Sequence, residues 1–79
     1  MKHLIEVTVC YKMGHQRFNS RCVLAGRNII RVEETPTEVP EYLDGMLTRI
    51  LLPTGEWVFV KEPYDEVVAM FERALEESL

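Results

Sequence analysis

The stretch HLIEVTVCYKMGHQRFNSRCVL, residues 3–24, decides the fold, because apolar and polar side chains alternate on either side of a glycine. In its first half, Ile5 and Val7 begin an apolar row that occupies every second position. A period of two is typical of a β-strand with one buried face. Gly14 follows within KMGH, and glycine readily adopts the positive φ that tight hairpin turns require. The stretch therefore predicts two strands joined by a turn, over residues 3–11 and 16–24.

The second strand of this hairpin separates apolar side chains from basic ones. Its inward set is predicted to be Phe18, Cys22 and Leu24, or their neighbours. Its outward set is predicted to be Arg17, Asn19 and Arg21. We therefore expect the basic residues of the hairpin to stand on its solvent side.

Three further strands follow, and residues of turn composition separate them. AGRN at 25–28 and PTGE at 53–56 favour turns. Pro36 ends the third strand because proline cannot donate to a ladder, and the segment after it is predicted to be the longest loop. The three strands are predicted over residues 29–33, 46–52 and 57–61. Because short turns join consecutive strands in antiparallel pairs, we expect a five-stranded meander.

The last segment changes to the period of a helix. Pro63 suits the first helical position, and Asp65 and Glu66 suit the positive end of a helix dipole. Apolar residues then recur at steps of three and four, at Tyr64, Val67, Val68, Phe71, Ala74 and Leu75. The chain is therefore predicted to be a single α+β domain over residues 1–79, an antiparallel meander of about five strands with one C-terminal amphipathic helix packed on the sheet.

Length and composition indicate a small folded domain in the cytoplasm. The 79 residues are 47% hydrophobic and 28% charged, which is the balance of a globular protein. A core this small often needs support from a second subunit, so we expect a homodimer. No apolar run approaches the roughly 20 residues that cross a bilayer, so no membrane contact is expected. Two cysteines are too few for a disulfide-rich secreted domain, and both are expected to be reduced.

Charge is divided along the chain. Residues 1–31 contain six basic residues and one acid, a balance of +5, whereas residues 32–79 contain three basic residues and twelve acids, a balance of −9. Summed surface charge steers encounters between proteins and their partners. The asymmetry therefore predicts two surfaces of opposite sign, one of which meets a partner.

Residues 29–37, IIRVEETPT, and residues 51–62, LLPTGEWVFVKE, together with the helix opening YDEVV, resemble the FlbD-type small flagellar proteins. Members of that family show an isoleucine-rich strand ending in Glu-Glu-Thr-Pro-Asp-Thr, a turn with glycine, a valine-rich strand ending in Lys-Glu, and a short Asp-Glu-Val helix. The likeness covers about half of the chain. This chain departs from the family in its longer N-terminal hairpin, in Thr37 where the family has aspartate, and in an insertion at 38–44. The resemblance implies a small bacterial or phage-encoded accessory protein without known catalytic residues, so no site is carried over.

Side chains that support catalysis or metal binding are not grouped in the sequence. The candidate metal ligands lack the short spacings of zinc sites, and they are His3, Cys10, His15 and Cys22. Neighbouring carboxylates such as those of Glu33 and Glu34 point to opposite sides of a strand, so they cannot act on one bond. The four glycines stand singly, and no phosphate-binding loop is present. We therefore expect no enzymatic activity, no catalytic residues, no metal and no cofactor.

The first functional hypothesis is a regulatory module that binds and modulates a larger protein machine, such as an inhibitor or accessory protein. It would act through an acidic face or through a free sheet edge. Carboxylates can occupy the basic groove of a nucleic-acid enzyme by charge complementarity, although keeping the protein soluble is a simpler use of them. The predicted partner-binding acids are Glu62, Glu66, Glu72, Glu76 and Glu77.

The alternative is a nucleic-acid-binding module that uses the basic hairpin. Its predicted contact residues are Lys12, Arg17, Arg21, Arg27 and Arg31, with Tyr11 or Phe18 available for stacking on bases. The opposing interpretation is that these cations pair internally and contribute little. Their partners would then be Glu33, Glu34, Glu38 or Glu41.

Three aromatic side chains are candidates for anchoring a protein contact. Aromatic residues dominate the energetics of many protein interfaces. The candidates are Tyr42, Trp57 and Tyr64, and we expect Trp57 to lie in the core.

Overall fold

Five antiparallel strands form one sheet, and a C-terminal helix packs against it. The computed structural model describes residues 4–77. The regular elements are β1 (Leu4–Met13), β2 (Gln16–Ala25), β3 (Arg31–Glu34), β4 (Thr48–Leu51), β5 (Trp57–Val60) and α1 (Tyr64–Glu77), with the short 3-10 helices η1 (Gly26–Asn28) and η2 (Glu41–Leu43) in the connections. The predicted α+β class is confirmed.

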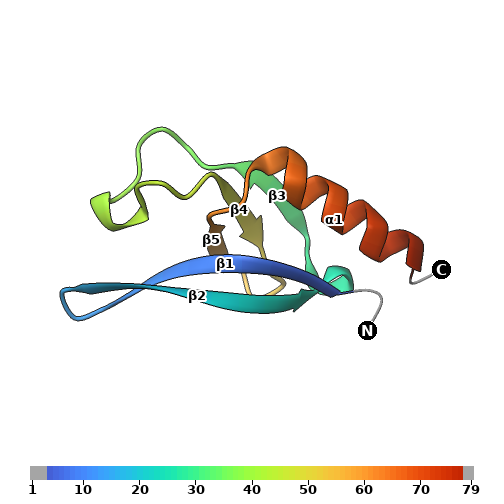
Figure 1. Cartoon of the computed structure of the whole chain (residues 1–79), viewed down its shortest axis with the longest axis horizontal. Coiled ribbons are helices and arrows are strands. Elements are labelled where there is room, and N and C mark those ends of the chain that lie inside the picture. The colour runs from blue at the N-terminus through green and yellow to red at the C-terminus, as the bar shows by residue number, and fades with distance from the viewer. Residues whose placement is uncertain (1–3, 78–79) are drawn as a thin grey trace.

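The strand order in the sheet is β2-β1-β5-β4-β3. A meander of β3, β4 and β5 is thus joined to the β1–β2 hairpin through pairing of β1 with β5. The two strands that are consecutive in the chain but not adjacent in the sheet are β2 and β3, which form its opposite edges. η1 lies between them and carries the chain from one edge to the other. Figure 1 shows the hairpin as a long ribbon beside the three shorter strands.

The hairpin has the register that its alternation predicts. Its ten pairs run from Leu4 opposite Ala25 to Met13 opposite Gln16, and Gly14 in the turn has a φ of 62°. Val7 lies opposite Cys22, so the apolar rows of both strands share one side of the ribbon. Arg17, Asn19 and Arg21 lie on the other side, as predicted, but Phe18 of the predicted inward set is exposed and the apolar Val23 shares the basic side.

The core lies between α1 and one face of the sheet. It consists of Ile5, Val7, Ile29, Ile50, Val60, Val67 and Ala74. Val67 and Ala74 come from the apolar stripe of α1, and Val7 and Ile50 come from different strands. Burying each large aliphatic side chain contributes about 1.5–3 kcal/mol, so the stripe that predicts the helix also attaches it to the sheet.

The pairing of β1 with β5 is short. Its register is the single pair Val9 and Val60, supported by a 2.9 Å hydrogen bond from the Lys61 N–H to the Thr8 carbonyl. Beyond Val9 the ribbon continues past the three shorter strands, and the molecule measures 42 × 22 × 21 Å along its principal axes. Figure 1 shows the end of the hairpin and the C-terminal part of α1 at opposite ends of the long axis.

The long loop after β3 folds back onto the body of the protein. Within it, Leu43 and Met46 are buried, and the Leu43 N–H donates to the Pro40 carbonyl at 2.9 Å to close the turn of η2. The loop thereby brings Tyr42 beside the end of the hairpin.

Candidate functional site

The end of the hairpin, residues 10–19, has an exposed apolar side, and we call these residues the hairpin tip. Tyr11 is 42% exposed, Met13 64% and Phe18 37%. The rings of Tyr11 and Phe18 stack across the two strands with centroids 5.6 Å apart. The apolar row that begins at Ile5 thus continues beyond the part of the ribbon that the core covers.

The opposite side of the hairpin tip is basic. Lys12 lies directly opposite Arg17 in the ladder, and its Nζ lies 5.6 Å from the centroid of the Tyr42 ring. The Cys10 thiol donates to the Tyr42 carbonyl at 3.2 Å, which ties η2 to this side of the ribbon. Like charges directly opposite one another in a ladder repel each other locally. Together, Lys12 and Arg17 give the tip a positive potential.

Two shallow hollows border the hairpin tip. One, of about 330 Å³, lies where β1 diverges from β5 and includes Cys10, Trp57 and Phe59 in its lining. The other, of about 400 Å³, is lined by Lys12, His15, Arg17, Pro40, Glu41 and Tyr42. The first lining includes the Cys10 thiol, and the second includes the His15 imidazole and the Glu41 carboxylate.

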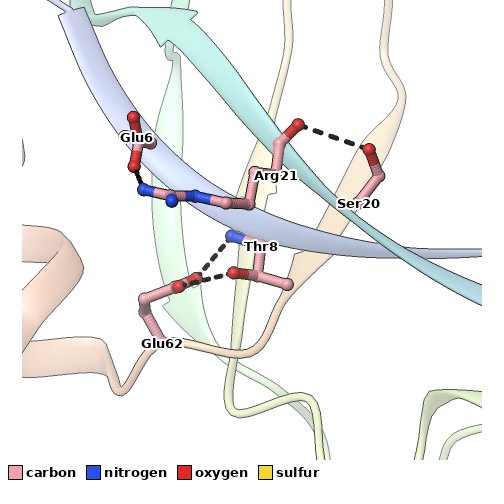
Figure 2. Close-up of polar contacts among 5 residues, drawn as sticks. All are labelled: Glu6, Thr8, Ser20, Arg21 and Glu62. Atoms are coloured by element: carbon pink, nitrogen blue, oxygen red, sulfur yellow. Dashed lines mark hydrogen bonds and ion pairs between the residues drawn. The ribbon is translucent and has the colours of Figure 1, made fainter.

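The predicted basic set is divided among four places. Lys12 and Arg17 lie at the hairpin tip, whereas Arg21 lies further along β2 and forms an ion pair with Glu6 (Figure 2). Arg27 is exposed in η1. Arg31 begins β3 at the other edge of the sheet, where its Nε lies 2.5 Å from Glu33 Oε2. The strand order therefore keeps these five cations from forming one ridge.

The first of the predicted partner-binding acids has a structural role. The Glu62 carboxylate accepts hydrogen bonds from the Thr8 N–H at 2.8 Å and from the Thr8 hydroxyl at 3.0 Å (Figure 2). The Thr48 hydroxyl donates to the Glu62 carbonyl at 2.7 Å. Glu62 precedes α1, and its hydrogen bonds to Thr8 attach the segment after β5 to the edge of β1.

The other predicted acids lie on α1. Glu66, Glu72 and Glu76 are exposed, and the side chain of Glu77 lies outside the described part of the chain. Glu72 and Glu76 are four residues apart and share one side of the helix. Glu66 shares its side with Arg73, seven residues on. The described acids of α1 therefore do not form one continuous face with Glu62.

A compact charged cluster covers the face of the sheet opposite the core. The Glu33 carboxylate accepts hydrogen bonds from Arg49 at 2.9 and 2.5 Å and lies beside Arg31. The Arg49 hydrogen bond, together with the charges of both arginines, lowers the pKa of Glu33 below its ordinary value of 4.5. The Arg49 guanidinium also lies 3.9 Å from the centroid of the Trp57 ring. These contacts fix the side chains of β3, β4 and β5 on this face.

The expectation that Trp57 lies in the core is wrong. Trp57 is half-buried, and it occupies the face of β5 opposite the buried Val60, under Arg49. Both faces of β5 carry apolar residues. The alternation therefore predicts that Trp57 and Phe59 share a face, but it does not predict which face of β5 packs against α1. An indole also forms a strong cation–π contact with a guanidinium, which favours a half-exposed position.

Residues 4–77 contain neither a cluster of potential metal ligands nor a membrane-spanning helix. Within that range no group of three or more His, Cys, Asp or Glu side chains is placed to hold a metal ion. His3 lies outside it. No helix in the same range is long and apolar enough to cross a membrane.

The sequence interpretation does not predict Met13 as a contact residue, and it predicts Tyr11 and Phe18 only as alternatives for stacking on bases, not as a pair stacked on each other. A signal for them exists, because the apolar alternation of β1 continues to position 13. A strand of ten residues spans about 33 Å, more than a core of this size covers. The alternating row is longer than the core, and the residues beyond the core form the exposed apolar side.

The chain has no significant match among family models, curated proteins or solved structures. The resemblance to FlbD-type proteins therefore remains a prediction from residues 29–37 and 51–68.

Proposed function

We propose that this protein is a non-enzymatic module that binds another protein through the apolar side of the hairpin tip. The observation that supports the proposal is the exposure of Tyr11, Met13 and Phe18 together at the projecting end of the ribbon. Large exposed apolar side chains that gather in one place are typical of contact surfaces. Aromatic and methionine side chains are enriched in such surfaces.

The charges beside this apolar side suggest the chemistry of the partner. Lys12 and Arg17 lie directly behind it on a ribbon only two strands wide, and neither forms an ion pair with another residue among 4–77. A partner surface with an apolar patch bordered by carboxylates would complement both sides of the tip. Complementary charge at the rim raises the association rate more than it raises the affinity.

The test compares which proteins are retained by the immobilised wild type and by two immobilised double variants. Tyr11→Ser combined with Met13→Ser removes two of the three exposed side chains of the apolar side, whereas Ile30→Ser combined with Leu47→Ser removes two exposed apolar side chains elsewhere. We expect proteins retained by the immobilised wild type to be retained by the second variant and lost from the first. The retained protein is then purified, and its dissociation constant should rise at least about tenfold for the first variant, as expected for loss of a hot spot.

Equal affinity of all three forms for the purified partner would overturn the proposal. Circular dichroism spectra of both double variants provide the control for folding. Because the replaced side chains are exposed, both variants should keep the spectrum of the wild type.

Nucleic-acid binding remains the second candidate, because an exposed aromatic stack lies close to two cations. Lys12 and Arg17 are on the side of the ribbon opposite the stack, so no single face offers both base stacking and phosphate contacts. This arrangement favours the protein-binding proposal. Fluorescence anisotropy with single-stranded RNA and with duplex DNA distinguishes the two, since binding to phosphates weakens steeply with salt. Salt-sensitive binding that Arg17→Glu abolishes would support the second candidate.

A further inference from the structure

We propose that a second copy of this chain pairs with the outer edge of β2, in antiparallel register centred on Ser20. The proposal concerns the edge of the hairpin, so it is independent of the partner-binding proposal, which concerns its apolar side. β2 is an edge strand of ten residues and is the longer of the two edge strands of this sheet. An edge of this length with open N–H and C=O groups is a template for another strand.

The hydrogen-bonding direction of each β2 residue follows from β1. The N–H and C=O of Thr8 point toward β5, since the first donates to Glu62 and the second accepts from Lys61. Alternate residues of a strand direct these groups to opposite edges, so Val7 and Val9 exchange hydrogen bonds with their β2 partners Cys22 and Ser20. The β2 residues with backbone groups at the outer edge are therefore Arg17, Asn19, Arg21, Val23 and Ala25.

Two local contacts agree with this direction. The Ser20 hydroxyl donates to the Arg21 carbonyl at 3.3 Å (Figure 2), and the Cys22 thiol lies 3.9 Å from the Val23 carbonyl. Both carbonyls belong to the outward set. They have a second lone pair for the N–H of an added strand.

Self-pairing of β2 has few possible registers, and charge distinguishes them. A two-fold axis perpendicular to the sheet at Ser20 places Arg17 opposite Val23 and Asn19 opposite Arg21, over residues 16–24. An axis at Asn19 places Arg17 opposite Arg21, and an axis at Arg21 places that residue opposite itself. Like charges directly opposite are destabilising. The axis at Ser20 is thus the register that pairs almost the whole strand without opposing two cations.

The same register provides complementary charge. Arg17 of one copy lies opposite Val23 of the other, and Glu6 lies next to Val23 in the same row. Two strand spacings, about 9.6 Å, separate the backbones of Arg17 and Glu6, a span that the two long side chains can bridge. Arg17 has no ion pair with another residue among 4–77, whereas Glu6 already accepts from Arg21 and can accept from a second guanidinium.

The pairing also extends the apolar side of the ribbon. A perpendicular two-fold axis keeps equivalent faces on the same side, so Phe18 of one copy comes opposite Cys22 of the other. The apolar sides of both hairpin tips then lie on one face of a continuous ten-stranded sheet. The β2 strand of a second copy therefore complements β2 in both charge and polarity.

The oligomeric state tests the proposal through Val23, which is 54% exposed. Sedimentation should give the wild type twice the 9.2 kDa mass of one chain. Val23→Lys places a cation opposite Arg17 of the other copy, and opposite Glu6 of its own copy, so it should give a folded monomer. Adding Arg17→Glu should restore the dimer by reversing one of the opposed charges. Ile30→Lys, which adds a cation at another exposed position, should leave the dimer unchanged.

The register is tested separately by disulfide formation in a Cys10→Ser, Cys22→Ala background. Ser20→Cys should form a covalent dimer on oxidation, because the two residues face each other across a non-hydrogen-bonded position, where backbones approach to about 4.5 Å. Asn19→Cys should stay uncoupled. A wild type that is monomeric up to about 1 mM would overturn the pairing. Coupling at position 19 instead of 20 would overturn the register.

Discussion

At the junction of β5 with α1, the Glu62 carboxylate accepts hydrogen bonds from both the N–H and the hydroxyl of Thr8. Its own carbonyl accepts from the buried Thr48. One residue thus connects the edge of β1 with the interior of β4 and the start of the helix. Hydrogen bonds to a charged acceptor contribute more than those between neutral groups, so this junction should be sensitive to substitution.

Glu62→Ala should lower the free energy of unfolding by about 1–3 kcal/mol, because the Thr8 N–H and hydroxyl lose their partners. Glu72→Ala, at an exposed helix position, should change it by less than about 0.5 kcal/mol. Urea unfolding followed by circular dichroism measures both. Equal effects of the two substitutions would show that the Thr8 contacts carry no stability.

Glu33 should contribute a pH-dependent part of the stability. Its pKa is lowered in the folded protein, chiefly by the Arg49 hydrogen bond, so the folded state favours the ionised form. That contribution is fully present above the unfolded pKa, ordinarily 4.5, and is lost as the pH falls through the lowered folded value. Wild type should therefore be more stable than Glu33→Gln at pH 7, and the difference should shrink in acid. Urea titrations at several pH values measure it, and a difference independent of pH would contradict the assignment.

Among the regular elements, α1 shows most directly how a residue pattern determines packing. Its apolar residues recur at helical steps, and the described ones that reach the sheet include Val67 and Ala74, both buried. Ala74 allows the close approach of the helix to the sheet because it has a small side chain. Ala69 lies on the exposed side of the same helix.

Two matched substitutions in α1 test this packing. Ala74→Leu should destabilise the protein by about 1–3 kcal/mol, since three additional carbons must fit into a filled core. Ala69→Leu adds the same atoms toward solvent and should stay within about 0.5 kcal/mol of wild type. Thermal unfolding of the two variants at equal concentration makes the comparison. A similar loss in both would mean that helix propensity, and not packing, determines the effect.

The hairpin and helix are predictable from sequence because their signals are local. Alternation around Gly14 and the three-to-four spacing after Pro63 depend only on neighbours in the chain. The adjacency of β1 with β5 is different, since it depends on which distant apolar faces pack together. The division of the basic residues follows from that long-range choice, because it places Arg31 at the edge opposite Arg21. The structural role of Glu62 likewise depends on Thr8, 54 positions away.

At the scale of the whole molecule, charge is separated along the 42 Å axis. The hairpin tip carries Lys12 and Arg17 at one end, and α1 carries exposed acids toward the other (Figure 1). The separation is partial, because Glu41 of η2 lies beside the tip and Arg21 and Arg31 are paired with acids. An elongated molecule with a positive end approaches a charged partner in a preferred orientation.

Protection against amide exchange should follow this long axis. The Thr8 amide, which is bound to Glu62 beside the β5 junction, should exchange slowly, whereas the Tyr11 amide, which is directed toward Phe18 of β2, lies beyond the last register pair of β1 with β5. We expect Tyr11 to exchange on the order of 100-fold faster, because opening of the tip leaves the core intact. Exchange followed by NMR measures both amides in one sample. Equal rates would mean that the hairpin opens only with the whole domain.

Pairing of β1 with β5 ends at Val9, and beyond it η2 contacts this side of the ribbon, through Cys10 and Lys12. From Val9 to Met13 the strand extends about 13 Å, so a tilt of about 15° at Val9, with η2 moving alongside, carries the tip through about 3–4 Å. Small adjustments in the twist near Val9 are thus magnified where the aromatic rings lie. The free end can adapt its position to a contact while the domain that anchors it stays rigid.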